Sequence, residues 1–238
     1  MFLFYHIYDK VKSRMIDVEK FFDEYKHGSA LWCPVSCEGA ELAKFADSVV
    51  ANGVSMVSVV PSAVATIWPW LEPFDIKIIS RVYIDDKKVS EKHVSDITQV
   101  IKESFKYGAH GAQVFLPLSA LAGLVDMTYW VKDDLFFDRD LIIGLNISEI
   151  NPLDWNDVFE NLRKIGANAL MLVLPKDTGI KSDFVGKINA MLDAWHEDNQ
   201  FDLHFMLGGN MSRIEQTLRL VESMQPELIK RLKFFVGY

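Results

Sequence analysis

The sequence predicts an α/β protein that folds as a single (β/α)8 barrel, also called a TIM barrel. Its 238 residues lie in the length range usual for such a barrel. From Ala30 onward, short apolar runs alternate with amphipathic stretches, as expected when each parallel strand is followed by a crossover helix. There are eight such runs, which is the number that closes a barrel.

The eight apolar runs are the predicted strands, and turn or helix signals separate each from the next. They cover Ala30–Val35, Val54–Val60, Ile76–Tyr83, Ala112–Leu116, Leu141–Ile147, Ala169–Leu174, Asp202–Leu207 and Lys233–Gly237.

Several of the intervening segments carry apolar residues at helical spacing, which indicates helices that pack one face on the barrel. The clearest faces are Leu42, Phe45, Ala46, Val49 and Val50, then Phe184, Ile188, Met191, Leu192 and Trp195, then Ile214, Leu218 and Val221. Gly53 should end the first of these helices. Ser212 and Glu215 form the pattern of a capping box at the start of the last one. Gly108-Ala109 and Gly166-Ala167 are expected in tight turns that lead into strands.

The two ends of the chain depart from the regular alternation. We expect residues 1–28 to form an N-terminal helical extension, with Val18, Phe21, Phe22 and Tyr25 on its apolar face, and residues 29–238 to form the barrel. No helix is expected after strand eight, which leaves one groove of the outer ring without its usual cover. The N-terminal segment, or the same surface of a second subunit, should cover that groove.

Composition excludes several classes of function. Lys and Arg total 25 against 33 Asp and Glu, and no dense basic run is present, so a nucleic-acid partner is not expected. Met1–Tyr5 is apolar but too short for a signal peptide or a membrane span, and we expect a cytoplasmic protein without a membrane partner. Cys33 and Cys37 are expected to be plain thiols, and no metal or cofactor is predicted.

Four motifs, taken in their order along the chain, resemble those of the deoxyribose-phosphate aldolase family, and together they span nearly the whole chain. They are Tyr107–Leu121, where Gly-Ala leads into a strand followed by Pro and Ala-Leu, Val57–Val64 with Pro61-Ser62, the strand after Gly166-Ala167, and Gly208-Gly209. The resemblance implies a class I aldolase, in which a lysine on the sixth strand forms a Schiff base. In that family an aspartate and a second lysine assist proton transfer.

At the positions that match these three catalytic residues, the chain has Gln113 for the aspartate, Met171 for the Schiff-base lysine and Phe205 for the second lysine. None of the three side chains can perform the family's chemistry. We expect all three to point into the C-terminal half of the barrel. If a gap is allowed in the sixth strand, Lys176 resembles the family's lysine and becomes the one candidate for a Schiff base.

Gly208, Gly209 and Asn210 lie where the resemblance implies that backbone amides hold a phosphate.

His204 has the parity opposite to Phe205 and should therefore face the helices, whereas His110 lies in a turn on the face opposite the catalytic rim. The carboxylates Glu149 and Asp177 lie near strand ends and are interpreted as solvated loop residues.

Three hypotheses follow. The first is a degenerate aldolase-like barrel that binds a small phosphorylated or anionic ligand, or a protein partner, without Schiff-base chemistry. The second is an active class I aldolase or lyase on a phosphorylated sugar or aldehyde that uses Lys176. The third is a non-aldolase enzyme on the same scaffold, since barrels host many chemistries. The sequence leaves the oligomeric state open, a homo-oligomer included.

Overall fold

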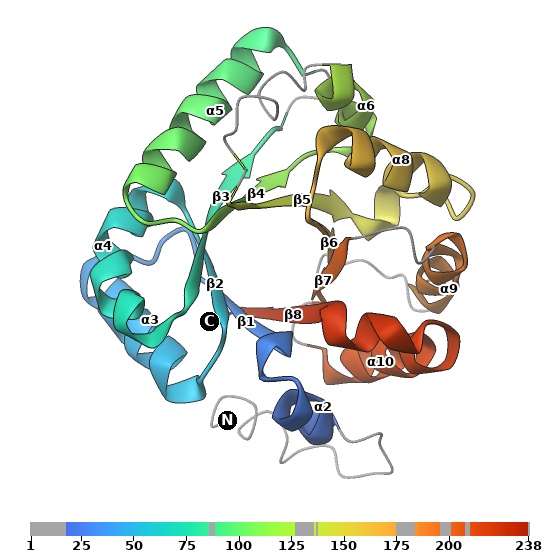
Figure 1. Ribbon diagram of the computed structural model, residues 1–238, viewed down its shortest axis with the longest axis horizontal. Coiled ribbons are helices and arrows are strands. Elements are labelled where there is room, and N and C mark those ends of the chain that lie inside the picture. The colour runs from blue at the N-terminus through green and yellow to red at the C-terminus, as the bar shows by residue number, and fades with distance from the viewer. Residues whose placement is uncertain are drawn as a thin grey trace.

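A computed structural model describes residues 18–85, 89–126, 136, 138–174, 184–195, 201–207 and 210–237. Its centre is a closed barrel of eight parallel strands in chain order (Figure 1). The strands are β1 Ser29–Trp32, β2 Met56–Val59, β3 Lys77–Tyr83, β4 Gly111–Phe115, β5 Asp140–Asn146, β6 Ala169–Val173, β7 Asp202–Met206 and β8 Leu232–Gly237. The predicted (β/α)8 barrel is therefore confirmed, and every predicted strand overlaps an observed one.

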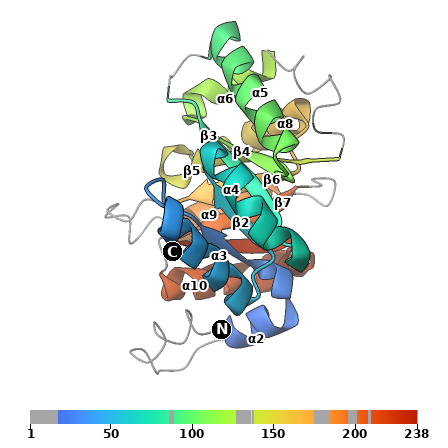
Figure 2. The same ribbon diagram turned by 90° about the vertical axis from the view of Figure 1, so that its left-hand side faces the viewer.

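Helices surround the barrel (Figures 1 and 2). The α-helices are α2 Val18–Glu24, α3 Gly39–Asn52, α4 Pro61–Leu71, α5 Glu91–Lys106, α6 Leu118–Asp126, α8 Trp155–Ile165, α9 Phe184–Ala194 and α10 Met211–Met224. Four short 3-10 helices are η1 Lys26–Gly28, η2 Glu72–Phe74, η3 Ile147–Glu149 and η4 Pro226–Arg231. Among the described residues, no helix is long and apolar enough to cross a membrane.

Alternation along the strands divides the apolar residues into an outer shell and a smaller inner core. The outer shell packs the strands against the helices and includes the predicted faces of α3 and α9. The inner core fills the lumen and consists of Ala30, Met56, Ile79, Ile142, Ala169, Met171 and Phe235. The lumen is therefore packed with side chains at its middle.

Two predicted glycine turns are confirmed. Gly166 ends α8 with φ 77°, and Gly108 follows α5 with φ 102°, a left-handed conformation that favours glycine. A Cβ atom at Gly108 would lie 2.0 Å from the Trp68 ring, so the close approach also requires glycine.

The predicted capping box at Ser212 is wrong. The N-cap of α10 is Asn210, whose side-chain oxygen accepts a hydrogen bond of 3.3 Å from the Arg213 backbone N–H. Glu215 pairs with Arg219 one turn later and does not reach back to the cap. An asparagine oxygen caps a helix as well as a serine hydroxyl does, and it lies two residues earlier.

Helix α2 packs on the outer face of β8, next to α10 (Figure 1). The Phe21 ring is buried and lies 5.7 Å from that of Phe234, while the Phe22 ring lies 6.3 Å from Phe234. Tyr25 is half-buried against the same core. The expectation that the N-terminal segment covers the last strand is confirmed for these three side chains, whereas that of Val18 lies outside the described residues.

We predict that Phe21→Ala lowers the free energy of unfolding by about 3 kcal/mol, because it removes a buried ring and leaves a cavity over β8. Thermal and urea unfolding would measure the change. Phe74→Ala is the matched control, since the Phe74 side chain is 54% exposed and its removal should have little effect. Equal stability of the two variants would contradict the proposed role of α2.

Candidate functional site

Polar side chains from three strands meet in the middle of the barrel. Ser58 on β2 donates a hydrogen bond of 2.5 Å to the Gln113 side-chain oxygen on β4, and the Gln113 Nε2 group donates one of 3.3 Å to the Met171 sulfur on β6. The Arg81 Nη1 atom on β3 lies 3.5 Å from the Ser58 Oγ. All four side chains are buried. They form a hydrogen-bonded layer that contains one positive charge, which we call the middle layer.

Arg81 is the unusual member of this layer, because it is a charged residue that is only 1% exposed. Its Nη2 atom donates to the Cys33 carbonyl at 2.8 Å, and the group lies 3.8 Å from the centre of the Trp32 ring. The Nε–H has no hydrogen-bond partner, and no ion pair found within the described ranges includes Arg81. Burial lowers the pKa of Arg81, but a guanidinium stays charged in proteins.

Aromatic rings cover the middle layer on the side of the strand C-termini. The Phe115 ring is perpendicular to Trp32 at 5.4 Å and stacked on Tyr83 at 5.3 Å. It lies against Gly144, where a Cβ atom would come within 2.3 Å of the ring. These three rings, Trp32, Tyr83 and Phe115, form what we call the aromatic cap.

A cavity of about 260 Å³ lies at the C-terminal mouth, beyond the aromatic cap. Phe115, Asn146, Val173 and Glu149 line it. Glu149 accepts hydrogen bonds from the Leu118 backbone N–H at 3.1 Å and from the Asn146 amide at 3.4 Å. Its carboxylate therefore holds the start of α6, so the interpretation of Glu149 as a solvated loop residue is incomplete.

The structure places two of the three family-matched positions inside the barrel. Gln113 and Met171 lie inside the barrel, as expected from their match to the family's catalytic positions, and they contact each other in the middle layer. The expectation for Phe205 is wrong, because its ring stacks on Phe234 at 5.6 Å in the outer shell. The inward side chain is that of the neighbouring His204, which contacts Phe235 of the inner core. The parity assigned to β7 was therefore off by one residue.

Other predicted site residues are only partly visible. Lys176, Asp177, Gly208 and Gly209 lie outside the described residues. Asn210 is described, and its side chain is engaged as the N-cap of α10.

The half-buried His110 and the two buried thiol groups have structural explanations. His110 lies in the turn before β4, where its Nδ1 atom accepts a hydrogen bond of 3.1 Å from the Ile78 backbone N–H, and burial lowers its pKa. Cys33 and Cys37 are buried free thiols, and burial raises the pKa of Cys33 to about 12. Within the described ranges, no group of three or more His, Cys, Asp or Glu side chains is arranged to hold a metal ion.

Within the described ranges, no lysine amine reaches the middle layer. Lys77 and Lys233 point into the barrel at the other, N-terminal end of the strands. Lys187 on α9 is buried outside the barrel, where its amine donates to three backbone carbonyls, those of Ile147, Ser148 and Ile150, at 3.2, 3.0 and 2.8 Å. These bonds use all three N–H donors of an ammonium group.

Sequence reasoning missed Arg81, although a signal was present. In the predicted strand Ile76–Tyr83, the charged residues Lys77 and Arg81 are four positions apart, which is an even spacing. They therefore share one face of the strand, and a closed barrel directs that face into the lumen.

Comparisons with known proteins support the fold alone. No protein-family model and no curated protein sequence matches the chain. Solved structures do match. A candidate deoxyribose-phosphate aldolase from Coccidioides immitis has a TM-score of 0.67 at 12% identity, over 95% of this chain and 84% of that one. The tetrameric deoxyribose phosphate aldolase from Aeropyrum pernix has a TM-score of 0.66 at 11% identity, over 93% and 92%.

The same barrel also resembles a protein from another functional class. A candidate copper homeostasis protein, CutC, from Streptococcus agalactiae has a TM-score of 0.59 at 8% identity, over 88% of this chain and 97% of that one. The chain thus has the barrel fold seen in deoxyribose-phosphate aldolases, and that fold occurs with more than one function.

We predict that Lys187→Met destabilises the protein by about 2 kcal/mol or more, because three buried carbonyls lose their charged donor. Thermal unfolding would measure the loss. Lys164→Met is the matched control: Lys164 is exposed, pairs with Glu160 on the surface of α8, and should change stability little. An unchanged melting temperature for Lys187→Met would contradict its structural role.

Proposed function

We propose that this deoxyribose-phosphate-aldolase-like barrel binds a small anionic ligand, a carboxylate or phosphate ester, in its C-terminal half and does not perform Schiff-base aldol chemistry. In this proposal, Arg81 binds the anionic group and Gln113 contributes a neutral hydrogen-bonding group. The aromatic cap encloses the ligand.

The buried charge of Arg81 carries the proposal. Removing a charged group from water is costly unless an opposite charge offsets it. Within the described ranges, the guanidinium has a backbone carbonyl, a serine hydroxyl and an aromatic face as neighbours, and its Nε–H is unpaired. An anion would supply both the missing charge and the missing acceptor. Guanidinium groups bind carboxylates and phosphates through two parallel N–H bonds, so the ligand class follows from the side chain.

The location supports the same function. Barrel proteins hold their ligands at the C-terminal ends of the strands, on the side where the aromatic cap and the adjoining cavity lie. Trp32 and Phe115 are only partly buried, so rotation of these side chains would connect the cavity with Arg81. Aromatic walls with few polar groups are typical of small-ligand sites.

The chemistry of the middle layer supports binding without an imine. A Schiff base needs a lysine amine, and Met171 offers a thioether at the matching position. Gln113 has a neutral amide there, which can hydrogen-bond but cannot exchange a proton as a carboxylate does.

An active class I aldolase that uses Lys176 is the second candidate, and the fold likeness to deoxyribose-phosphate aldolases favours it. A non-aldolase enzyme is the third, favoured by the likeness to the CutC barrel. Trapping experiments separate the first two, because only the aldolase forms a covalent intermediate.

We predict that the protein binds deoxyribose 5-phosphate or inorganic phosphate in isothermal titration calorimetry, and that it does not bind unphosphorylated deoxyribose. Arg81→Gln should weaken one phosphate site about tenfold or more, because two charge-assisted hydrogen bonds are lost. Arg163→Gln, which changes an exposed arginine on α8, should leave the affinity unchanged. If Arg81→Gln folds normally and binds phosphate as tightly as the unmodified protein at every site, the proposal is wrong.

We predict no cleavage of deoxyribose 5-phosphate and no borohydride-reduced adduct on Lys176, measured by product assay and by peptide mass spectrometry. Met171→Lys should not create activity by itself, since Gln113 and the outward Phe205 leave proton transfer and lysine activation unsupplied. A reduced adduct on Lys176, together with turnover that Lys176→Ala abolishes, would establish the aldolase instead.

A further inference from the structure

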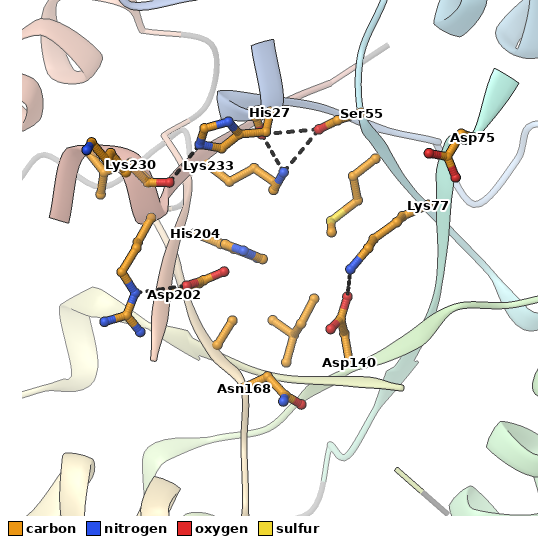
Figure 3. A pocket seen from close by; sticks show the side chains of 15 residues that line it. His27, Ser55, Asp75, Lys77, Asp140, Asn168, Asp202, His204, Lys230 and Lys233 are labelled. Carbon is orange, nitrogen blue, oxygen red and sulfur yellow. Dashed lines mark hydrogen bonds and ion pairs between the residues drawn. The ribbon is translucent and has the colours of Figure 1, made fainter. Parts of the chain in front are cut away.

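A second cavity, of about 330 Å³, opens at the N-terminal mouth of the barrel, opposite the candidate site (Figure 3). Its lining differs in character from the aromatic cap, because most of it is charged or polar. The side chains come from the first residues of the strands and from the turns before them, including Lys77 of β3, Asp140 of β5, Asp202 of β7 and Lys233 of β8.

Lys233 is a buried amine without a carboxylate partner. Lys233 is 9% exposed. Its amine donates one hydrogen bond to the His27 carbonyl and another, of 3.1 Å, to the Ser55 hydroxyl. Both acceptors are neutral, and no ion pair found within the described ranges includes Lys233. An ammonium group has three N–H donors, so one remains for a ligand.

His204 lies beside Lys233, because the two residues are register partners on β7 and β8. Its side chain points into the cavity, is 3% exposed, and has an Nδ1 atom without a hydrogen-bond partner (Figure 3). Burial, and then the charges of Lys233 and Lys77, lower the pKa of His204 to about 3. The ring is therefore neutral at physiological pH, and one of its two nitrogens carries a proton.

The other charges in the cavity largely offset one another. Lys77 forms an ion pair of 2.7 Å with Asp140, and Arg231 forms one of 3.1 Å with Asp202. Of the remaining lining residues, His27 donates from its ring to the Lys230 carbonyl at 2.6 Å.

Two more charged groups line the cavity, and they have opposite signs. Asp75 comes from the turn before β3 and Lys230 from η4, and both residues are exposed. Among the described residues, Lys233 is therefore a buried positive charge without an ion-pair partner, although the nearby carboxylates of Asp202 and Asp140 favour its charged form.

We infer that the N-terminal mouth is a second binding site for a small oxyanion, a carboxylate or a phosphate group, held between the Lys233 ammonium and the His204 imidazole. The side-by-side placement of a free ammonium N–H and an unpaired ring nitrogen provides two adjacent hydrogen-bonding positions. The cavity has room for more than the anionic group alone. This site is independent of the one proposed around Arg81.

Binding should depend on pH in a specific direction. Burial lowers the pKa of Lys233 to about 8, and a bound anion would raise it by favouring the charged amine. Affinity should therefore be retained below pH 8 and fall as the pH rises above 8, and binding at pH 8 should take up protons from the buffer. The neutral imidazole of His204 does not titrate in this range.

Calorimetric titration with inorganic phosphate would test the site, with acetate as the carboxylate probe and glycerol as the neutral control. We expect Lys233→Met to weaken one phosphate site about tenfold or more, and His204→Phe to weaken the same site. Arg81→Gln should leave the phosphate affinity of this site unchanged. A result that contradicts this inference can therefore be told apart from one that contradicts the proposed function. Lys164→Met, which removes a surface amine, is the matched control. If Lys233→Met changes the phosphate affinity of none of the sites, the inference is wrong.

A footprint on the unmodified protein avoids dependence on the folding of the variants. Lys233 should be acylated at pH 8 by an acetylating reagent, and phosphate should protect it, as measured by peptide mass spectrometry. Lys164 should show no protection. Equal acylation of Lys233 with and without millimolar phosphate would show that the cavity holds only water and would overturn the inference.

Discussion

The alternation of side chains in a closed barrel is the constraint from which both mouths and the core derive. Each strand contributes two or three inward positions, and these must fill a lumen of fixed width. Apolar residues such as Ala30 and Ile142 fill part of it. Polar residues are tolerated inside only where they find partners or reach water. Arg81 with its hydrogen-bonded neighbours and Lys233 at the open N-terminal mouth represent these two cases.

Three buried cations show three ways to offset the cost of removing charge from water. Lys187 satisfies its donors with three carbonyls of one loop, and its role is complete without a ligand. Arg81 uses an aromatic face and a carbonyl, and keeps one donor unpaired. Lys233 uses two neutral oxygens and a lowered pKa, which reduces the fraction of time it is charged. A ligand gains most binding free energy at a buried charged group that lacks an ion-pair partner or keeps an unpaired hydrogen-bond donor.

The barrel was predictable from sequence because eight apolar runs and their intervening stripes reflect packing that the backbone imposes locally. It was harder to predict which side chains of a strand point inward. Strands of a parallel barrel are apolar on both faces, so their sequences usually do not show the alternation of period two. In β7 the polar Asp202 and His204 alternate with Leu203 and Phe205, and this alternation indicates the inward face correctly. Counting from the Gly-Gly pair instead placed Phe205 inside. The charge of Arg81 was visible in the sequence, but the absence of a counter-charge among the described residues depends on side chains far apart in the chain.

The contact between α2 and β8 joins one of the first described elements to the last one. During synthesis from the N-terminus, the phenylalanines of α2 leave the ribosome well before Phe234 exists, and no shorter nascent chain can bury them in their final place. Ring closure by the pairing of β1 with β8 faces the same delay. Folding of this barrel can therefore finish only after β8 has been synthesised, with an apolar helix exposed in the meantime, and holding chaperones would have a target in α2.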